Sequence, residues 1–298
     1  MQEMQQLFSQ QWGERWERSL AAALRAPTCH VALLNAFLPC QPSPQQLQLP
    51  GATPLPLPAS AAPLRALRWQ PEADAPGGGG GYPPPGRDPA TGLATHYWLD
   101  PASLLPPLAL GVAPGLTVLD MCAAPGGKSL ALAQLLFGAD GGGGGGGEAG
   151  LLVCNELDAV RRGRLSRVLR EYLPAAAAAR VRVTPHDAAR HWAHCEQGAF
   201  DAVLLDAPCS SDRHCLQQAA ARADGAVPRA HWSARRCRRL AGEQARLLAA
   251  GLRALRPGGL LAYSTCRSAP QVAGARVAAG AKEAAGARTP LGACSGLG

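Results

Sequence analysis

The sequence predicts an α/β protein with a doubly wound, mostly parallel, Rossmann-like sheet. Three observations lead to this prediction. Short apolar runs alternate with helix-length stretches between residues 116 and 264. A glycine-containing loop follows the first of these runs, and a polar or thiol side chain follows the carboxyl end of each run. In sheets of this type, ligands bind along the edge where the strands end.

The length and charge of the chain limit its class. At 298 residues it can hold one large domain, or one domain with appendages. No window approaches the ~18 uninterrupted apolar residues of a membrane span, so we expect a soluble protein with no membrane partner. The formal net charge is +8, and only Lys128 and Lys282 are lysines. This basic, arginine-rich character suits nucleic acid, but a general bias toward alanine, glycine, proline and arginine accounts for it equally well.

The ten cysteines include no Cys-x-x-Cys pair, which argues against a zinc ribbon or a redox motif. A chain of this size does not need a disulfide framework, so free thiols in a reducing compartment are the simplest expectation. His191 and His194 lie close together, but the sequence offers no matching pair of ligands nearby. We therefore expect no metal site.

Residues 1–40 are expected to form a helical segment, and residues 41–94 are expected to form a linker. Apolar residues recur every fourth position and form a stripe that would pack against the rest of the protein: Phe8, Trp12, Trp16, Leu20 and Leu24. A mitochondrial presequence is the weaker alternative, because the acids Glu3, Glu14 and Glu17 are unlike a transit peptide. The stretch 41–94 is rich in proline and glycine, which predicts a linker or a poorly ordered arm.

The first strand, loop and helix of the expected domain run from residue 116 to residue 137. Four apolar or β-branched residues lead into Asp120, a tight loop spans Met121 to Gly127, and a helix is expected over Lys128–Phe137. Before them, residues 96–115 are expected to form an extended piece, a short helix and a turn. Gly126 and Gly127 lack β-carbons, so a ligand could lie on the backbone, although any strand-to-helix turn uses glycine. A phosphate-binding P-loop is disfavoured, because it needs a glycine where Cys122 stands.

Four further strands are expected at 151–155, 181–184, 200–205 and 260–264. Helices are expected after Asp158 and over 235–255, and the insert Gly141–Gly147 is expected to be a surface loop. Glu156 ends the second strand, where an acid commonly holds ribose hydroxyls, although a solvated loop acid fits the same spacing. The strands would place a set of polar residues along one edge: Asp120, Glu156, Asp187, Asp206 and Cys266.

Two cysteines, Cys209 and Cys266, follow strands and can therefore face the same crevice, although a buried cysteine is more often a small hydrophobe. Two thiols beside a nucleoside-type site suggest covalent chemistry on an electrophilic ring. Carbon-5 of cytosine cannot take a methyl group directly, but a thiolate that adds to carbon-6 makes carbon-5 enamine-like. The reaction also needs an acid at the pyrimidine and a way to break the adduct.

Three motifs together resemble the Sun-type RNA 5-methylcytosine methyltransferases: CAAPGGK at 122–128, DAPCSSDR at 206–213 and YSTC at 263–266. The resemblance covers roughly residues 95 to 266, and NELD at 155–158 is most similar to the mitochondrial branch of the family. It implies a class I methyltransferase domain over 95–266 that uses S-adenosylmethionine. It also implies an RNA substrate, with tRNA favoured and rRNA as the alternative, and a location in the mitochondrial matrix.

The resemblance also implies a role for each site residue. The loop would hold the methionine part of the cofactor, Glu156 the ribose and Asp187 the adenine, with Arg161 nearby. Asp206 would lie between the target base and the cofactor, Cys266 would be the nucleophile, and Cys209 would assist release. The loop consists of Cys122, Ala123, Ala124, Pro125, Gly126, Gly127 and Lys128.

The chain departs from the family pattern after Cys266. Family members usually carry an acid–asparagine pair after this cysteine and then further strands. Here residues 267–298 are a low-complexity tail rich in alanine and glycine, which resembles a truncated or alternatively spliced end. The alternative to an active enzyme is therefore a catalytically dead isoform that binds cofactor or RNA.

Overall fold

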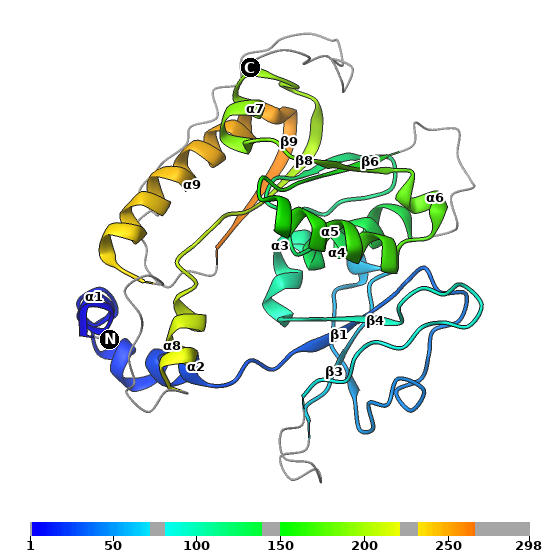
Figure 1. Cartoon of the computed structure of the whole chain (residues 1–298), viewed down its shortest axis with the longest axis horizontal. Helices are drawn as coiled ribbons and strands as arrows, with labels where there is room; N and C mark the ends of the chain where they lie inside the picture. Colours follow the sequence, from blue (N-terminus) through cyan, green and yellow to red (C-terminus); the bar gives the residue numbers. More distant parts are fainter. Residues whose placement is uncertain (1, 72–80, 139–149, 221–231, 266–298) are drawn as a thin grey trace.

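The computed structural model describes residues 2–71, 81–138, 150–220 and 232–265 (Figure 1). A five-stranded parallel sheet with the order β7-β6-β5-β8-β9 forms its centre. The order reverses beside β5, as in a doubly wound fold, so the predicted fold class is confirmed. The strands are β5 (Thr117–Asp120), β6 (Leu151–Asn155), β7 (Val181–Thr184), β8 (Phe200–Asp206) and β9 (Leu255–Ser264).

Helices cover both faces of this sheet, which explains why its strands are almost continuously apolar. Along β5, Val118 packs on one face and Leu119 on the other, and both are fully buried. The first face packs against α4 (Gly127–Phe137) and α5 (Ala159–Tyr172), and the second against α7 (Ala188–His194) and α9 (Ala234–Ala254). A short helix, α6 (Ala175–Ala178), precedes β7.

Side-chain caps set the start of the two helices that border the site. Asp158 accepts a hydrogen bond from the backbone N–H of Arg161 at 2.8 Å, which fixes the first turn of α5 as predicted. Ser233 accepts one from the N–H of Arg236 at 3.2 Å at the start of α9. The sequence did not predict α8 (Asp212–Ala220), which follows the Pro-Cys segment after β8.

A second, antiparallel sheet lies on the far side of α4 and α5 from the parallel sheet (Figure 1). Its order is β2-β3-β1-β4, with β1 (Val31–Leu34), β2 (Thr53–Pro54), β3 (Ala66–Arg68) and β4 (His96–Leu99). The stretch 41–94 was expected to be a linker or a poorly ordered arm, but it supplies β2, β3 and the short η2 (Ala59–Ala61). Its described residues are ordered because Leu47, Leu49 and Leu64 are buried. The division of the chain at residues 40, 94 and 266 stays a prediction.

The N-terminal helices pack against the rest of the protein, as predicted. They comprise α1 (Gln2–Trp12), the π-helical turn η1 (Trp16–Leu20) and α2 (Ala21–Arg25). Phe8 and Trp16 are fully buried in a cluster with Leu216 of α8 and Trp232 before α9. The expected short helix after β4 is present as η3 (Pro101–Leu104) and α3 (Leu105–Ala109).

Several expectations fall on residues that the structure does not describe. The insert 141–147, Cys266 and the tail 267–298 all lie outside the described ranges. Within those ranges, no helix is long and apolar enough to cross a membrane, and no group of three or more potential ligands could hold a metal ion. His191, considered above as a metal ligand, instead stacks on His186 with ring centroids 3.7 Å apart.

Candidate functional site

Two glycines shape the loop between β5 and α4. Neighbouring side chains fill the space that a Cβ on either glycine would need. Gly126 has a φ of +119°, and a Cβ there would lie 3.1 Å from Cγ1 of Val168. A Cβ on Gly127 would lie 2.9 Å from the ring of Tyr97. We expected the missing side chains to leave room for a ligand on the backbone. In the structure they permit the turn and the close packing of α5 and β4, and a cofactor on this loop stays a prediction.

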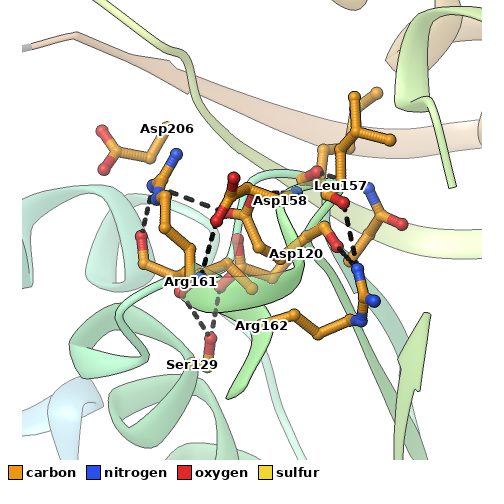
Figure 2. Close-up of polar contacts among 12 residues, drawn as sticks. Asp120, Ser129, Leu157, Asp158, Arg161, Arg162 and Asp206 are labelled. Atoms are coloured by element: carbon orange, nitrogen blue, oxygen red, sulfur yellow. Dashed lines mark hydrogen bonds and ion pairs between the residues drawn. The ribbon is translucent and has the colours of Figure 1, made fainter. Parts of the chain in front are cut away.

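Asp120 is a buried carboxyl group at the end of β5. Its Oδ2 accepts a hydrogen bond from Ser129 Oγ of α4 at 2.7 Å, and its buried Oδ1 has no hydrogen-bond partner among the described residues (Figure 2). Burial raises the pKa of Asp120 to about 7, and the nearby charge of Asp206 adds to the rise. The sequence placed Asp120 at this edge, but it gave no sign of so strong a desolvation.

Lys128, at the start of α4, joins the loop to the end of β8. Its Nζ lies 2.7 Å from Oδ2 of Asp206. The Lys128 side chain is 20% exposed and the Asp206 side chain 33%. Ser264 Oγ of β9 donates a 2.8 Å hydrogen bond to the other oxygen, Oδ1. Asp206 is therefore held from two neighbouring elements at the carboxyl edge of the sheet.

The cysteines near this edge differ from the expectation in one respect. Cys209 lines the same cleft as Asp206, but it is disulfide-bonded, as is Cys195, so free thiols were the wrong expectation for these two. Cys122 and Cys154 are free, and burial raises the pKa of both thiols. Cys266 lies outside the described residues, two positions after the end of β9.

Glu156 and Arg161 form the opposite end of the site. One Glu156 oxygen, Oε1, accepts a hydrogen bond from the N–H of Asp158 at 3.0 Å. The other, Oε2, is buried 3.4 Å from Arg161 Nη2 and accepts no hydrogen bond within the described residues. Arg161 also donates from Nη2 to the carbonyl of Ala124 at 2.8 Å, so it ties α5 to the loop (Figure 2).

A cleft of about 1130 Å³ connects these groups along the sheet edge. Asp187 lines it as an exposed residue and caps α7 by accepting from the N–H of Ala189 at 3.1 Å. The predicted residues that the cleft brings together are Cys122, Ala124, Glu156, Arg161, Asp187, Asp206 and Cys209. A smaller pocket of about 210 Å³ lies on the other side of the loop and is lined by the predicted residues Ala123, Pro125, Gly127 and Lys128. Gly126 lines neither of the two.

The sequence reasoning missed two contributions to the cleft. Asn155 connects the neighbouring strand ends, because its Nδ2 donates to the carbonyls of Met121 at 3.1 Å and His186 at 3.0 Å. Its place in the NELD motif was the available signal. Arg236 and Arg246 of α9 also line the cleft. The arginine-rich start of that helix was visible in the sequence, but its position over the sheet edge was not.

Comparisons with known proteins agree with this geometry. A family model described as 16S rRNA methyltransferase RsmB/F matches residues 107–285, beyond the expected domain end at 266. The 5-cytosine rRNA methyltransferase NSUN4 of Bos taurus is 44% identical over 185 residues, which are 61% of this chain and 44% of the relative. The mitochondrial tRNA (cytosine(34)-C(5))-methyltransferase of Danio rerio is 42% identical over 178 residues, 58% of this chain and 42% of the relative. The chain therefore spans less than half the length of these relatives.

A solved structure supports the same fold. The methyltransferase homolog protein from Pyrococcus horikoshii matches with a TM-score of 0.60 and 27% sequence identity. The match covers 90% of this chain and 73% of that one.

Proposed function

Because this chain belongs to the 16S rRNA methyltransferase RsmB/F family, we propose that it transfers a methyl group from S-adenosylmethionine to carbon-5 of cytosine in RNA. One observation carries the proposal. The CAAPGGK loop and the DAPC segment meet through the 2.7 Å contact of Lys128 with Asp206, at the edge where the cleft also contains Cys209. A base placed there would face the acid, while a cofactor in the cleft would extend toward Glu156.

The residues of the cleft fit S-adenosylmethionine, which supplies an electrophilic methyl group on its sulfonium. The cleft, at about 1130 Å³, has room for a nucleoside and an amino acid together. Buried Oε2 of Glu156 accepts no hydrogen bond from the described residues, so it suits a ribose hydroxyl. We assign the adenine to the region of Asp187 and the methionine part to the loop at 122–128.

In the proposed reaction the Cys266 thiolate adds to carbon-6 of cytosine, and the carbon-5=carbon-6 double bond becomes a single bond as its π electrons shift into the ring. Asp206, held by Lys128 and Ser264, hydrogen-bonds the pyrimidine as its electron density shifts. Carbon-5 then takes the methyl group, and the bond between that methyl group and the sulfonium sulfur breaks to leave a neutral thioether. Loss of the carbon-5 proton and cleavage of the carbon-6–sulfur bond restore the ring, and we assign this release to Cys209. Because Cys209 is disulfide-bonded in the structure, the role requires its reduced thiol.

We propose a mitochondrial RNA as the substrate and the mitochondrial matrix as the location. The similar proteins include rRNA methyltransferases and mitochondrial tRNA methyltransferases at comparable identities, 44% and 42% in the two compared above. The NELD motif and the residues of the DAPCSSDR motif favour tRNA. The wobble cytosine of mitochondrial methionine tRNA is the first candidate, and rRNA is the alternative.

Bisulfite sequencing tests this proposal directly. Mitochondrial tRNA and small-subunit rRNA transcripts are incubated with the protein, S-adenosylmethionine and a thiol reductant. We expect one protected cytosine in one of the two RNAs. Asp206→Asn is the matched control, because it preserves shape but removes the charge that Lys128 pairs, and it should reduce methylation strongly. Absence of protected cytosine with folded, cofactor-bound protein would support the alternative of a catalytically dead binding isoform.

A further inference from the structure

A groove of about 870 Å³ lies on the antiparallel sheet, outside the cleft described above. We call it the aromatic groove. It is bordered by the chain that leads from α2 into β1 and by the segment that follows β3. Its lining residues that matter here are Cys29, His30, Pro50, Arg68, Trp69 and Pro101.

The ring of Trp69 lines the groove, and neighbouring groups hold it in place. Trp69 donates from Nε1 to the carbonyl of Pro50 at 3.1 Å. Its ring centroid lies 6.0 Å from those of both Tyr82 and Trp98. The Trp69 side chain stays half-buried rather than fully enclosed. A partly exposed aromatic ring with little freedom to move is the usual platform for stacking an unpaired base.

The aromatic groove is continuous with the catalytic edge through His30. This residue lines both the groove and the smaller pocket that contains Lys128 and Asp206. Its backbone N–H donates to Tyr82 Oη at 2.9 Å, which fixes its position. The buried Nδ1 of its ring has no hydrogen-bond partner among the described residues. His30 is therefore shared by the two hollows, with a buried ring nitrogen whose hydrogen-bonding capacity is unused within the described residues.

The charge of the lining also fits a nucleic acid. No aspartate or glutamate is found among the described residues that line the aromatic groove, and Arg68 contributes an exposed guanidinium. We propose that the aromatic groove binds the unpaired nucleotides next to the target cytosine, with a base stacked on Trp69 and a phosphate near Arg68. This inference rests on the proposed function, because the target cytosine itself is placed beside Asp206.

Alkylation of two thiols tests the groove without a measurement of activity. Cys29 lines the groove and Cys40 does not, and both are exposed free cysteines. Reaction with N-ethylmaleimide, followed by peptide mass spectrometry, is compared with and without a short single-stranded RNA that contains one cytosine. We expect the RNA to slow alkylation of Cys29 several-fold and to leave Cys40 unchanged. A duplex of the same sequence should protect Cys29 much less.

Substitutions provide the second measurement. Arg68→Ala combined with Trp69→Leu should weaken binding of the single-stranded RNA about ten-fold or more, because a stacked base and a phosphate contact are lost. Arg65→Ala is the matched control, since Arg65 is an exposed arginine of the same segment that does not line the groove. Affinity for S-adenosylmethionine should be unchanged in all variants, which verifies that they are folded.

The outcomes separate this inference from the proposed function. If the protein methylates RNA while Cys29 stays equally reactive, or while the double variant binds RNA normally, the groove assignment is wrong. If Cys29 is protected but no 5-methylcytosine forms, the groove is an RNA site and the proposed activity is wrong. Protection of Cys29 that rises with protein concentration in the absence of RNA would show self-association at this surface and would overturn the inference.

Discussion

Single residues determine the electrostatics of the catalytic edge, where two carboxyl groups share one lysine. Asp206 is paired directly by Lys128 at 2.7 Å, whereas Asp120 lies deeper and accepts a hydrogen bond from the hydroxyl of Ser129. Burial therefore penalises the charge of Asp120 much more than that of Asp206. The pKa of Asp120 is consequently raised to about 7.

Asp120 should consequently make the stability of the protein depend on pH. Its native pKa of about 7 lies above its ordinary value of 3.8, so between these values the native state binds more protons than the unfolded state. The free energy of unfolding should therefore fall as the pH rises from about 4 to about 7. Asp120→Asn removes this contribution and can still accept the hydrogen bond from Ser129. Relative to the parent, the variant should gain stability over this interval, by roughly a few kcal/mol.

Chemical denaturation of both proteins at several pH values measures the difference. Asp158→Asn is a suitable control, because Asp158 is an exposed cap residue of α5 and asparagine also caps helices. Parallel stability curves for the parent and Asp120→Asn would show that Asp120 is not desolvated as the structure indicates.

At the scale of elements, the N-terminal helices hold the segment that follows the Pro-Cys motif. Phe8 of α1 lies with its ring centroid 6.3 Å from that of Trp232. Trp232 donates from Nε1 to Asp212 Oδ1 at 2.9 Å, and Ser210 Oγ donates to the same oxygen at 2.5 Å. Residues 2–25 therefore form part of the folded core beside the site.

Phe8→Ala should accordingly destabilise the protein by about 3–5 kcal/mol, because it leaves a cavity in a fully buried aromatic cluster. Gln6→Ala, an exposed position of the same helix, should change the free energy of unfolding by no more than about 0.5 kcal/mol. Urea denaturation of the three proteins gives the comparison. Equal stability of Phe8→Ala and Gln6→Ala would mean that α1 does not pack as described.

The start of α9 is the second element with a functional prediction. Arg235, Arg236 and Arg239 are exposed on this helix, and Arg236 also lines the cleft. Their replacement by alanine should weaken RNA binding and reduce its dependence on salt, because fewer counterions are released on binding. Affinity is measured over a series of salt concentrations.

A control removes the same charge from α5. Arg164, Arg167 and Arg170 are exposed there and do not line the cleft, so their replacement should have a smaller effect on the salt slope. Equal slopes for the two triple variants would show that only net charge matters and that α9 has no special role.

At the scale of the whole molecule, the parallel sheet could be predicted because burial makes its three central strands, β6, β5 and β8, largely apolar. The antiparallel sheet could not, because β2 has two residues and β3 three, within a proline-rich stretch. Such short strands are specified by their pairing, of β3 with β1 and of β2 with β3, rather than by their own pattern. Helix α8 was missed because its buried face includes a charged residue, Asp212, among apolar ones.

For the candidate site, too, the sequence predicted some features and could not predict others. Strand ends predicted that Glu156, Asp187 and Asp206 would share an edge, and the structure places all three along one cleft. Sequence spacing could not show that Gly127 makes room for Tyr97, since the two come from different elements. The raised pKa of Asp120 was equally inaccessible, because it depends on how completely several elements exclude water together.

The last prediction concerns the two cysteines of the proposed reaction, Cys209 and Cys266. If Cys266 adds to carbon-6, Cys266→Ala should abolish both methylation and any covalent protein–RNA adduct. Cys209→Ala should still transfer the methyl group but release the RNA slowly. An adduct stable to denaturing electrophoresis should therefore accumulate in this variant alone. Cys40→Ala, at an exposed free cysteine, serves as the control and should behave like the parent.

The same experiment must be run in thiol reductant, because Cys209 is disulfide-bonded in the structure and a disulfide sulfur cannot serve as the releasing thiol. Without reductant, the parent should behave like Cys209→Ala and accumulate adduct, and it should resume release of methylated RNA when reductant is added. The opposite pattern, with adduct in Cys266→Ala and none in Cys209→Ala, would make Cys209 the nucleophile. Absence of any adduct in all folded, cofactor-bound variants would favour the dead isoform, because a protein without the covalent step can bind RNA but cannot activate carbon-5.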